Sequence, residues 1–144
     1  MTIIDTERLR LRPWNRSDAP ALYELAKEQR IGMACGWRPY TRIDDAYDGL
    51  STVLAAPESY AVTLRESNEL VGAIALRMKA ADQRNVADLG YWTGRPYWGN
   101  GYATEAGRAI VDRAAHLGYA TLTLSYFEGN EASRRVAHKL GFTW

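Results

Sequence analysis

The first segment with a clear pattern of hydrophobic and polar positions runs from Thr6 to Trp14. Leu9 and Leu11 alternate there with charged residues, and a period of two residues is typical of a strand with one buried face. We therefore expect a half-buried strand. Its polar face carries three arginines that we expect to be solvated: Arg8, Arg10 and Arg12.

The same reading predicts the helices and strands of the rest of the chain. One helix begins at Ser17–Asp18, whose side chains can cap its first turn, and a second begins at Asp44–Asp45 and reaches Leu54. Glycines and a proline in residues 31–41 indicate a loop between them. The later elements are a strand over Ser59–Arg65, a turn at Ser67–Asn68, a strand over Leu70–Met78, a strand from Val86, a helix over Tyr102–Leu117, a strand over Ala120–Tyr126 and a helix over Glu131–Leu140. Gly72 inside a strand indicates a bulge or a close backbone approach.

The order β-α-α-β-β-β-α-β-α predicts a mixed α/β fold in a single domain over residues 1–144. Residues 86–126 form a strand–helix–strand unit. We therefore expect those two strands to be parallel, with a right-handed crossover between them.

Composition and charge narrow the class of protein. The chain is 47% hydrophobic and 24% charged with a formal net charge of +1, which argues against a general binder of nucleic acid or membrane surfaces. It shows no apolar run long enough to span a bilayer and no signal peptide. A single cysteine, Cys35, cannot form an internal disulfide, so we expect a cytoplasmic protein.

The stretch from Leu89 to Ala106 holds the strongest candidate for a binding site. A short aromatic strand ends before Pro96, a turn with Gly99 and Gly101 follows, and a helix begins at Tyr102. A glycine turn that opens a helix directs unpaired backbone N–H groups and the positive end of the helix dipole to one spot. Such a spot favours an anion, above all a phosphate.

Two common nucleotide motifs fit this turn poorly. A Walker motif requires lysine after its last glycine, and Tyr102 follows Gly101. The dinucleotide motif GxGxxG lacks its third glycine, because Thr104 stands in that place. A nucleotide-binding protein therefore stays a weaker alternative.

Three segments together resemble one family. They are Thr6–Pro13, Tyr97–Ala106 and Asn130–Phe142, and they resemble the first strand and the two cofactor motifs of the GNAT superfamily of N-acetyltransferases, in its RimJ/RimL-like branch. The resemblance implies a central twisted mixed sheet with helices on both faces, and acetyl-CoA as the acetyl donor. Members continue into further strands that pair beside the strand at 120–126, and this sequence ends before them. The resemblance thus implies either a C-terminally truncated domain or an edge covered by another chain, as in a homodimer.

The resemblance also implies which residues bind acetyl-CoA. Backbone N–H groups of the strand end would hold the pantetheine arm, and those of the glycine turn would hold the diphosphate. Trp98 stands where many superfamily members have Gln or Arg, but tryptophan is usual in this branch. The implied set is Tyr91, Trp92, Thr93, Trp98, Gly99, Asn100, Gly101, Tyr102, Ala103, Thr104, Asn130, Ser133 and Arg134.

The implied chemistry is direct attack of an amine on the thioester. By resemblance Ser133 would protonate the leaving thiolate, since the position of the tyrosine acid of other members is held by Ala137. Asp88 and Glu128 lie at the strand ends beside the expected cleft, and we take Asp88 as the candidate general base. The acceptor site would include Met33, Trp37 and Tyr40, although packing at a helix–loop junction explains these residues equally well.

The sequence therefore predicts an N-acetyltransferase that acts on a protein N-terminus or a small-molecule amine. The main alternative is a CoA-binding module without turnover. Two separated histidines and one cysteine predict no metal site.

Overall fold

The structure is a computed structural model and describes residues 2–28, 40–78, 85–124 and 131–142. Met33, Trp37, Asn130 and Glu128 lie outside these residues. No helix in the described segments is long and apolar enough to cross a membrane.

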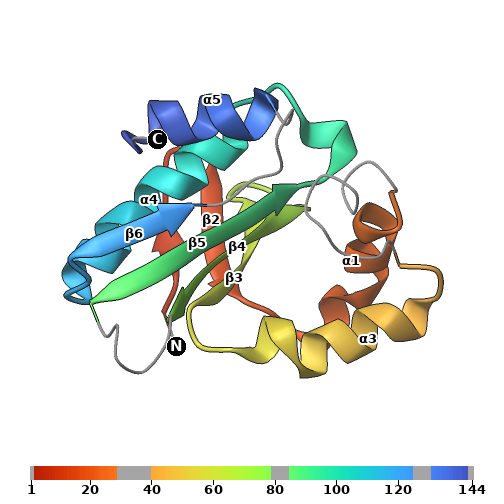
Figure 1. The fold of residues 1–144 in the computed structure, drawn as a ribbon. Coiled ribbons are helices and arrows are strands. Elements are labelled where there is room, and N and C mark those ends of the chain that lie inside the picture. The colour runs from red at the N-terminus through yellow and green to blue at the C-terminus, as the bar shows by residue number, and fades with distance from the viewer. Residues whose placement is uncertain (1, 29–39, 79–84, 125–130, 143–144) are drawn as a thin grey trace.

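The described strands form one six-stranded sheet in the order β1-β2-β3-β4-β5-β6 (Figure 1). The strands are β1 Ile4–Asp5, β2 Leu9–Pro13, β3 Ser59–Leu64, β4 Leu70–Met78, β5 Val86–Thr93 and β6 Thr121–Leu124. Neighbours are antiparallel except β5 and β6, which are parallel as the strand–helix–strand unit predicts. The mixed α/β fold is confirmed.

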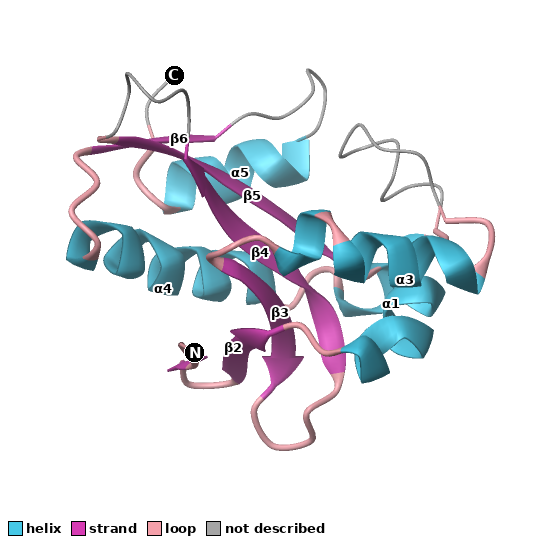
Figure 2. Cartoon of the chain, turned by 90° about the horizontal axis from the view of Figure 1, so that it is seen from below, coloured by secondary structure: helices cyan, strands magenta, loops and turns pink. Residues whose placement is uncertain are grey.

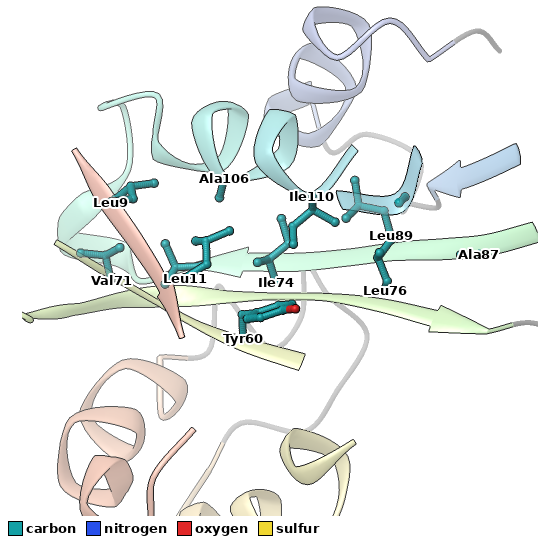
Figure 3. Close-up of a cluster of buried hydrophobic side chains, with 12 residues drawn as sticks. Leu9, Leu11, Tyr60, Val71, Ile74, Leu76, Ala87, Leu89, Ala106 and Ile110 are labelled. Carbon is teal, nitrogen blue, oxygen red and sulfur yellow. The ribbon is translucent and has the colours of Figure 1, made fainter. Parts of the chain in front are cut away.

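Helices cover both faces of this sheet (Figures 1 and 2). The α-helices are α1 Ala19–Ala26, α3 Ile43–Ser51, α4 Tyr102–His116 and α5 Glu131–Lys139, and short 3-10 turns are η1 Arg16–Asp18, η2 Val53–Ala55 and η3 Arg95–Tyr97. In Figure 3, α4 lies on one side of the strands and α1 and α3 on the other. The sheet is therefore the middle layer of three.

Side-chain alternation along the strands divides the core into two clusters. Leu9, Leu11, Ile74 and Leu89 pack with Ile110 of α4 in the first cluster (Figure 3). In the second, Ala61 and Leu70 pack against α1 and α3. Tyr60 and Val62 belong to the first cluster and Ala61 to the second, as a period of two requires.

Gly72 produces the predicted irregularity in β4. The register with β3 shifts there, since Val62 pairs with Gly72 but Thr63 pairs with Leu70, which leaves Val71 as an extra residue. A Cβ on Gly72 would lie 2.3 Å from the carbonyl oxygen of Trp92. Both parts of the prediction, the bulge and the close approach, are confirmed.

The expectation that the three arginines of the segment Thr6–Trp14 are merely solvated is wrong. The Nε atom of Arg10 donates to Asp5 at 2.8 Å, and Arg12 makes a two-pronged pair with Asp18 at 2.8 and 2.9 Å. Arg8 pairs with Glu105 at 2.7 Å. Each guanidinium thus pairs with a carboxylate, and the strand pattern alone does not reveal these partners.

Two helix boundaries also differ from the predicted ones. Asp18 does not simply cap α1: its carboxylate accepts the backbone N–H of Asn15, and η1 precedes the helix. The second helix ends at Ser51, before η2, because Thr52 leaves the helical conformation with φ of −123° and ψ of −94°. The hydroxyls of Ser51 and Thr52 donate to carbonyls one turn back.

Candidate active site

The candidate site begins where β5 ends. Thr93 closes the strand, the N–H of Gly94 donates to the carbonyl of Val71 at 2.7 Å, and η3 follows. A Cβ on Gly94 would lie 2.6 Å from a methyl carbon of Leu25, so a side chain here would require Leu25 of α1 to move. The loop therefore leaves the sheet in a direction set by both β4 and α1.

Gly99 and Gly101 both adopt the left-handed backbone conformation, with φ of 83° and 78°. Gly101 is the N-cap of α4 and no side chain caps that end. The first backbone hydrogen bond of the helix runs from Glu105 N–H to the Gly101 carbonyl at 3.0 Å. The amides of Tyr102, Ala103 and Thr104 thus have no helical carbonyl to bind, which is the arrangement that favours an anion.

Side chains of the loop hold its own backbone. Trp98 Nε1 donates to the carbonyl of Thr93 at 2.6 Å, and Asn100 Nδ2 donates to the carbonyl of Tyr97 at 2.9 Å. The Arg95 guanidinium lies 4.8 Å from the centre of the Trp98 ring. Trp98 and Asn100 therefore shape the loop with their side chains and leave its main chain to contact a ligand.

A shallow hollow joins the strand end to the helix start. Its lining includes Tyr91, Trp92, Thr93, Tyr102 and Ala103. The structure thus brings together five residues that the sequence assigned to acetyl-CoA, from two segments of the chain.

Beside this hollow, β5 has described partners on both sides only up to Leu89. The described part of β6 pairs with β5 as far as Leu124, whose partner is Leu89, whereas β5 pairs with β4 as far as Thr93. Gly90 follows Leu89 on β5, and no described atom lies within 4 Å of the position its Cβ would take.

Asp88 lies on β5, one residue before Leu89, and pairs with Thr123 of β6. It is half-buried, and its Oδ1 accepts a hydrogen bond from the hydroxyl of Thr123 on β6 at 2.7 Å. Because neighbouring residues of a strand face opposite ways, Asp88 shares a face with Trp92 rather than with the core residue Leu89.

Ser133 and Arg134 lie near the start of α5, half-buried and exposed respectively. Helix α5 lies over α4 and begins at the same end of the molecule as the glycine loop (Figure 1). Gly107 permits this packing, because a Cβ there would lie 2.6 Å from a methyl carbon of Leu140.

Tyr40 is the one acceptor candidate among the described residues. It is packed against the second core cluster with Trp92 and Tyr97. Burial, together with the nearby charge of Asp45, raises the pKa of its hydroxyl. The packing role that the sequence left open is observed, and its acceptor role stays a prediction.

Sequence reasoning missed a cluster around Glu105 in the first turn of α4. The carboxylate accepts hydrogen bonds from the Thr6 hydroxyl and from the backbone N–H and Nε of Arg8, at 2.5, 2.9 and 2.7 Å. Burial opposes ionisation of Glu105, but these donors outweigh it and hold the pKa of the carboxyl below its usual value. The partners lie 97 residues apart in the case of Arg8, so no local pattern could reveal them.

Comparison with known proteins identifies the family of this chain. Residues 8–143 match the model of the "Acetyltransferase (GNAT) domain". The chain belongs to the GNAT family of acetyltransferases. It is 28% identical over 150 residues to the uncharacterised N-acetyltransferase YoaA of Bacillus subtilis, which covers 97% of this chain and 82% of that protein.

Solved structures share the GNAT fold. A GNAT-family acetyltransferase from Bacillus anthracis superposes with a TM-score of 0.87 at 22% identity, covering 97% of this chain and 82% of that one. RimL, a ribosomal L7/L12 alpha-N-protein acetyltransferase solved with coenzyme A, gives 0.83 at 22% identity and covers 99% and 84%. GNAT acetyltransferases use acetyl-CoA as donor, and the glycine loop has the features that a diphosphate requires.

Proposed function

We propose that this GNAT acetyltransferase transfers the acetyl group of acetyl-CoA to a primary amine of a protein N-terminus or a small molecule, as in the RimJ/RimL-like branch. One observation carries the proposal. The loop with left-handed Gly99 and Gly101 opens α4 beside the end of β5, and the hollow there is lined from both elements. The N-terminal acceptor draws support from the likeness to RimL.

Binding of acetyl-CoA rests mainly on the main chain. The amides of residues 99–104 hold the diphosphate, and the backbone of residues 91–93 holds the pantetheine arm and the thioester carbonyl. Arg134 on the exposed side of α5 and Asn130 before that helix supply further polar contacts. Trp98 contributes by holding the loop through its bond to Thr93.

Transfer needs an uncharged amine, a polarised thioester carbonyl and a proton for the departing sulfur. The amine nitrogen forms the new C–N bond, and the C–S bond then breaks with its electron pair remaining on sulfur. We assign Ser133 as the proton donor to that sulfur. Asp88 takes the proton from the amine, with Thr123 orienting its carboxylate.

Acetyl-CoA-dependent thiol release with a panel of amines and N-terminal peptides tests this function. We expect release only when an amine is present, and a drop in kcat of about 10²-fold in Ser133→Ala with little change in acetyl-CoA affinity. Ser17→Ala, an exposed serine in η1, is the matched control. Acetyl-CoA binding without release on any amine would instead indicate a CoA-binding module without turnover.

A further inference from the structure

The carboxylate of Glu105 poses an electrostatic problem for the glycine loop. Glu105 lies in the first turn of α4, where the proposed function places a diphosphate. The negative charge of its carboxylate would repel the negative charge of the diphosphate and so oppose binding. Both carboxylate oxygens, however, are directed to the N-terminal segment: Oε1 accepts from Arg8 Nε, and Oε2 accepts from Arg8 N and from Thr6. The carboxylate is thus neutralised by donors that come from outside the loop.

The Arg8 guanidinium also holds the loop backbone. Its Nη1 donates to the carbonyl of Asn100 at 2.8 Å, and the guanidinium carbon lies 4.7 Å from the centre of the Tyr102 ring. In a trans peptide the C=O and the following N–H point in opposite directions. Because Arg8 binds the Asn100 carbonyl, the N–H of Gly101 points away from Arg8.

One side chain therefore contacts three successive parts of the anion-binding segment. Arg8 fixes the peptide before Gly101, stacks on the first residue of α4 and neutralises Glu105. The two hydrogen bonds leave its guanidinium in a defined orientation although the side chain is 44% exposed. A surface ion pair alone contributes little, but this network combines charge, stacking and backbone contact.

We propose that Arg8 is a positioning residue for the diphosphate of acetyl-CoA: it orients the Asn100–Gly101 peptide and cancels the charge of Glu105. This inference rests on the proposed function, since it requires the diphosphate at the loop. Arg8 acts through the loop backbone and through Glu105.

Affinity for acetyl-CoA and for acetyl-pantetheine, which lacks the diphosphate, separates this role from a merely structural one. We expect Arg8→Ala to weaken acetyl-CoA binding by about tenfold and to leave acetyl-pantetheine binding unchanged. Adding Glu105→Gln to Arg8→Ala removes the uncompensated charge and should recover part of the loss. Arg8→Lys keeps the charge but cannot reproduce the two guanidinium hydrogen bonds to Glu105 and to the Asn100 carbonyl. Its affinity for acetyl-CoA should therefore lie between those of the native protein and Arg8→Ala.

Arg10→Ala is the matched control. Arg10 lies two residues further along, on β2, is equally exposed at 44% and pairs with Asp5 away from the loop. It should change neither affinity. Thermal unfolding of each variant without ligand shows whether the protein remains folded under the assay conditions.

The possible results test the role of Arg8 separately from the proposed binding of acetyl-CoA. If the native protein binds acetyl-CoA no better than acetyl-pantetheine, the placement of the diphosphate at the loop is wrong. If the native protein prefers acetyl-CoA and both Arg8 variants keep that preference in full, the role of Arg8 is refuted while the site stands. Equal losses for the two ligands in folded Arg8→Ala protein also refute it.

Discussion

The α-carbon of Gly72 faces the carbonyl oxygen of Trp92 so closely that a Cβ would lie 2.3 Å from it. The close approach places the bulge of β4 beside the end of β5, and Gly72 itself is among the residues that line the hollow at the candidate site. The backbone of the site therefore depends on the absence of a side chain at this position.

Gly72→Ala should destabilise the protein, because the added methyl group meets backbone atoms on a neighbouring strand. We expect a loss of about 2–4 kcal/mol in the free energy of unfolding, measured by urea denaturation. Gly90→Ala is the matched control, since no described atom lies within 4 Å of its Cβ position. It should cost little stability and still weaken acetyl-CoA binding. Equal stability of the two variants would contradict this account of the bulge.

Gly101→Ala tests the loop. A left-handed φ of 78° costs a non-glycine residue about 1–2 kcal/mol, and strain that shifts the N-cap displaces the amides that follow. Gly118→Ala, at φ 92° beyond the other end of α4, carries the same strain without proximity to the loop. Calorimetry should show weaker acetyl-CoA binding only for Gly101→Ala, with similar losses of stability in both. Parallel affinities in the two variants would argue against the loop as the phosphate site.

Asp88→Asn should lower kcat while it leaves acetyl-CoA affinity within about twofold, because the amide cannot take a proton. Thr123→Val removes only the hydrogen bond to Asp88 and should lower kcat by a smaller factor. Steady-state kinetics and acetyl-CoA titration of both variants provide the readout. An unchanged kcat in Asp88→Asn would remove this residue from the mechanism.

Alkaline stability depends on Tyr60. Burial, with a further contribution from the hydrogen bond to Glu58, raises the pKa of this tyrosine to about 12. The unfolded chain ionises near pH 10 and the folded one does not, so the folded state holds more protons over pH 10–12 and loses stability as pH rises through that window. We expect a decline on the order of 1–2 kcal/mol in the unfolding free energy. Tyr60→Phe should show a shallower decline, and an identical slope would contradict the assignment.

Much of the fold could be predicted because burial on one face imposes a period on each element. Leu9 and Leu11 alternate along β2, and the glycine loop directly precedes α4 as its turn chemistry requires. The two-residue strand β1 was missed, since it is too short to show a period. Val53, predicted within the second helix, is instead 56% exposed in η2, because Thr52 leaves the helical conformation before it.

The site could be predicted only in its local part. Gly99, Gly101 and the end of β5 adjoin in sequence, so turn chemistry and family resemblance located them. Thr6 and Arg8 reach Glu105 only through the pairing of the sheet, and Asp88 meets Thr123 only through the parallel ladder. Contacts of this kind come from tertiary structure rather than from a local pattern.

The most direct test of the central claim is a calorimetric titration of acetyl-CoA into the protein, followed by thiol release in the same cell when amines are added. We predict saturable binding at one site, and release that depends on the amine. Absence of binding would contradict both the assignment of the glycine loop as the diphosphate site and the acetyl transfer that depends on it.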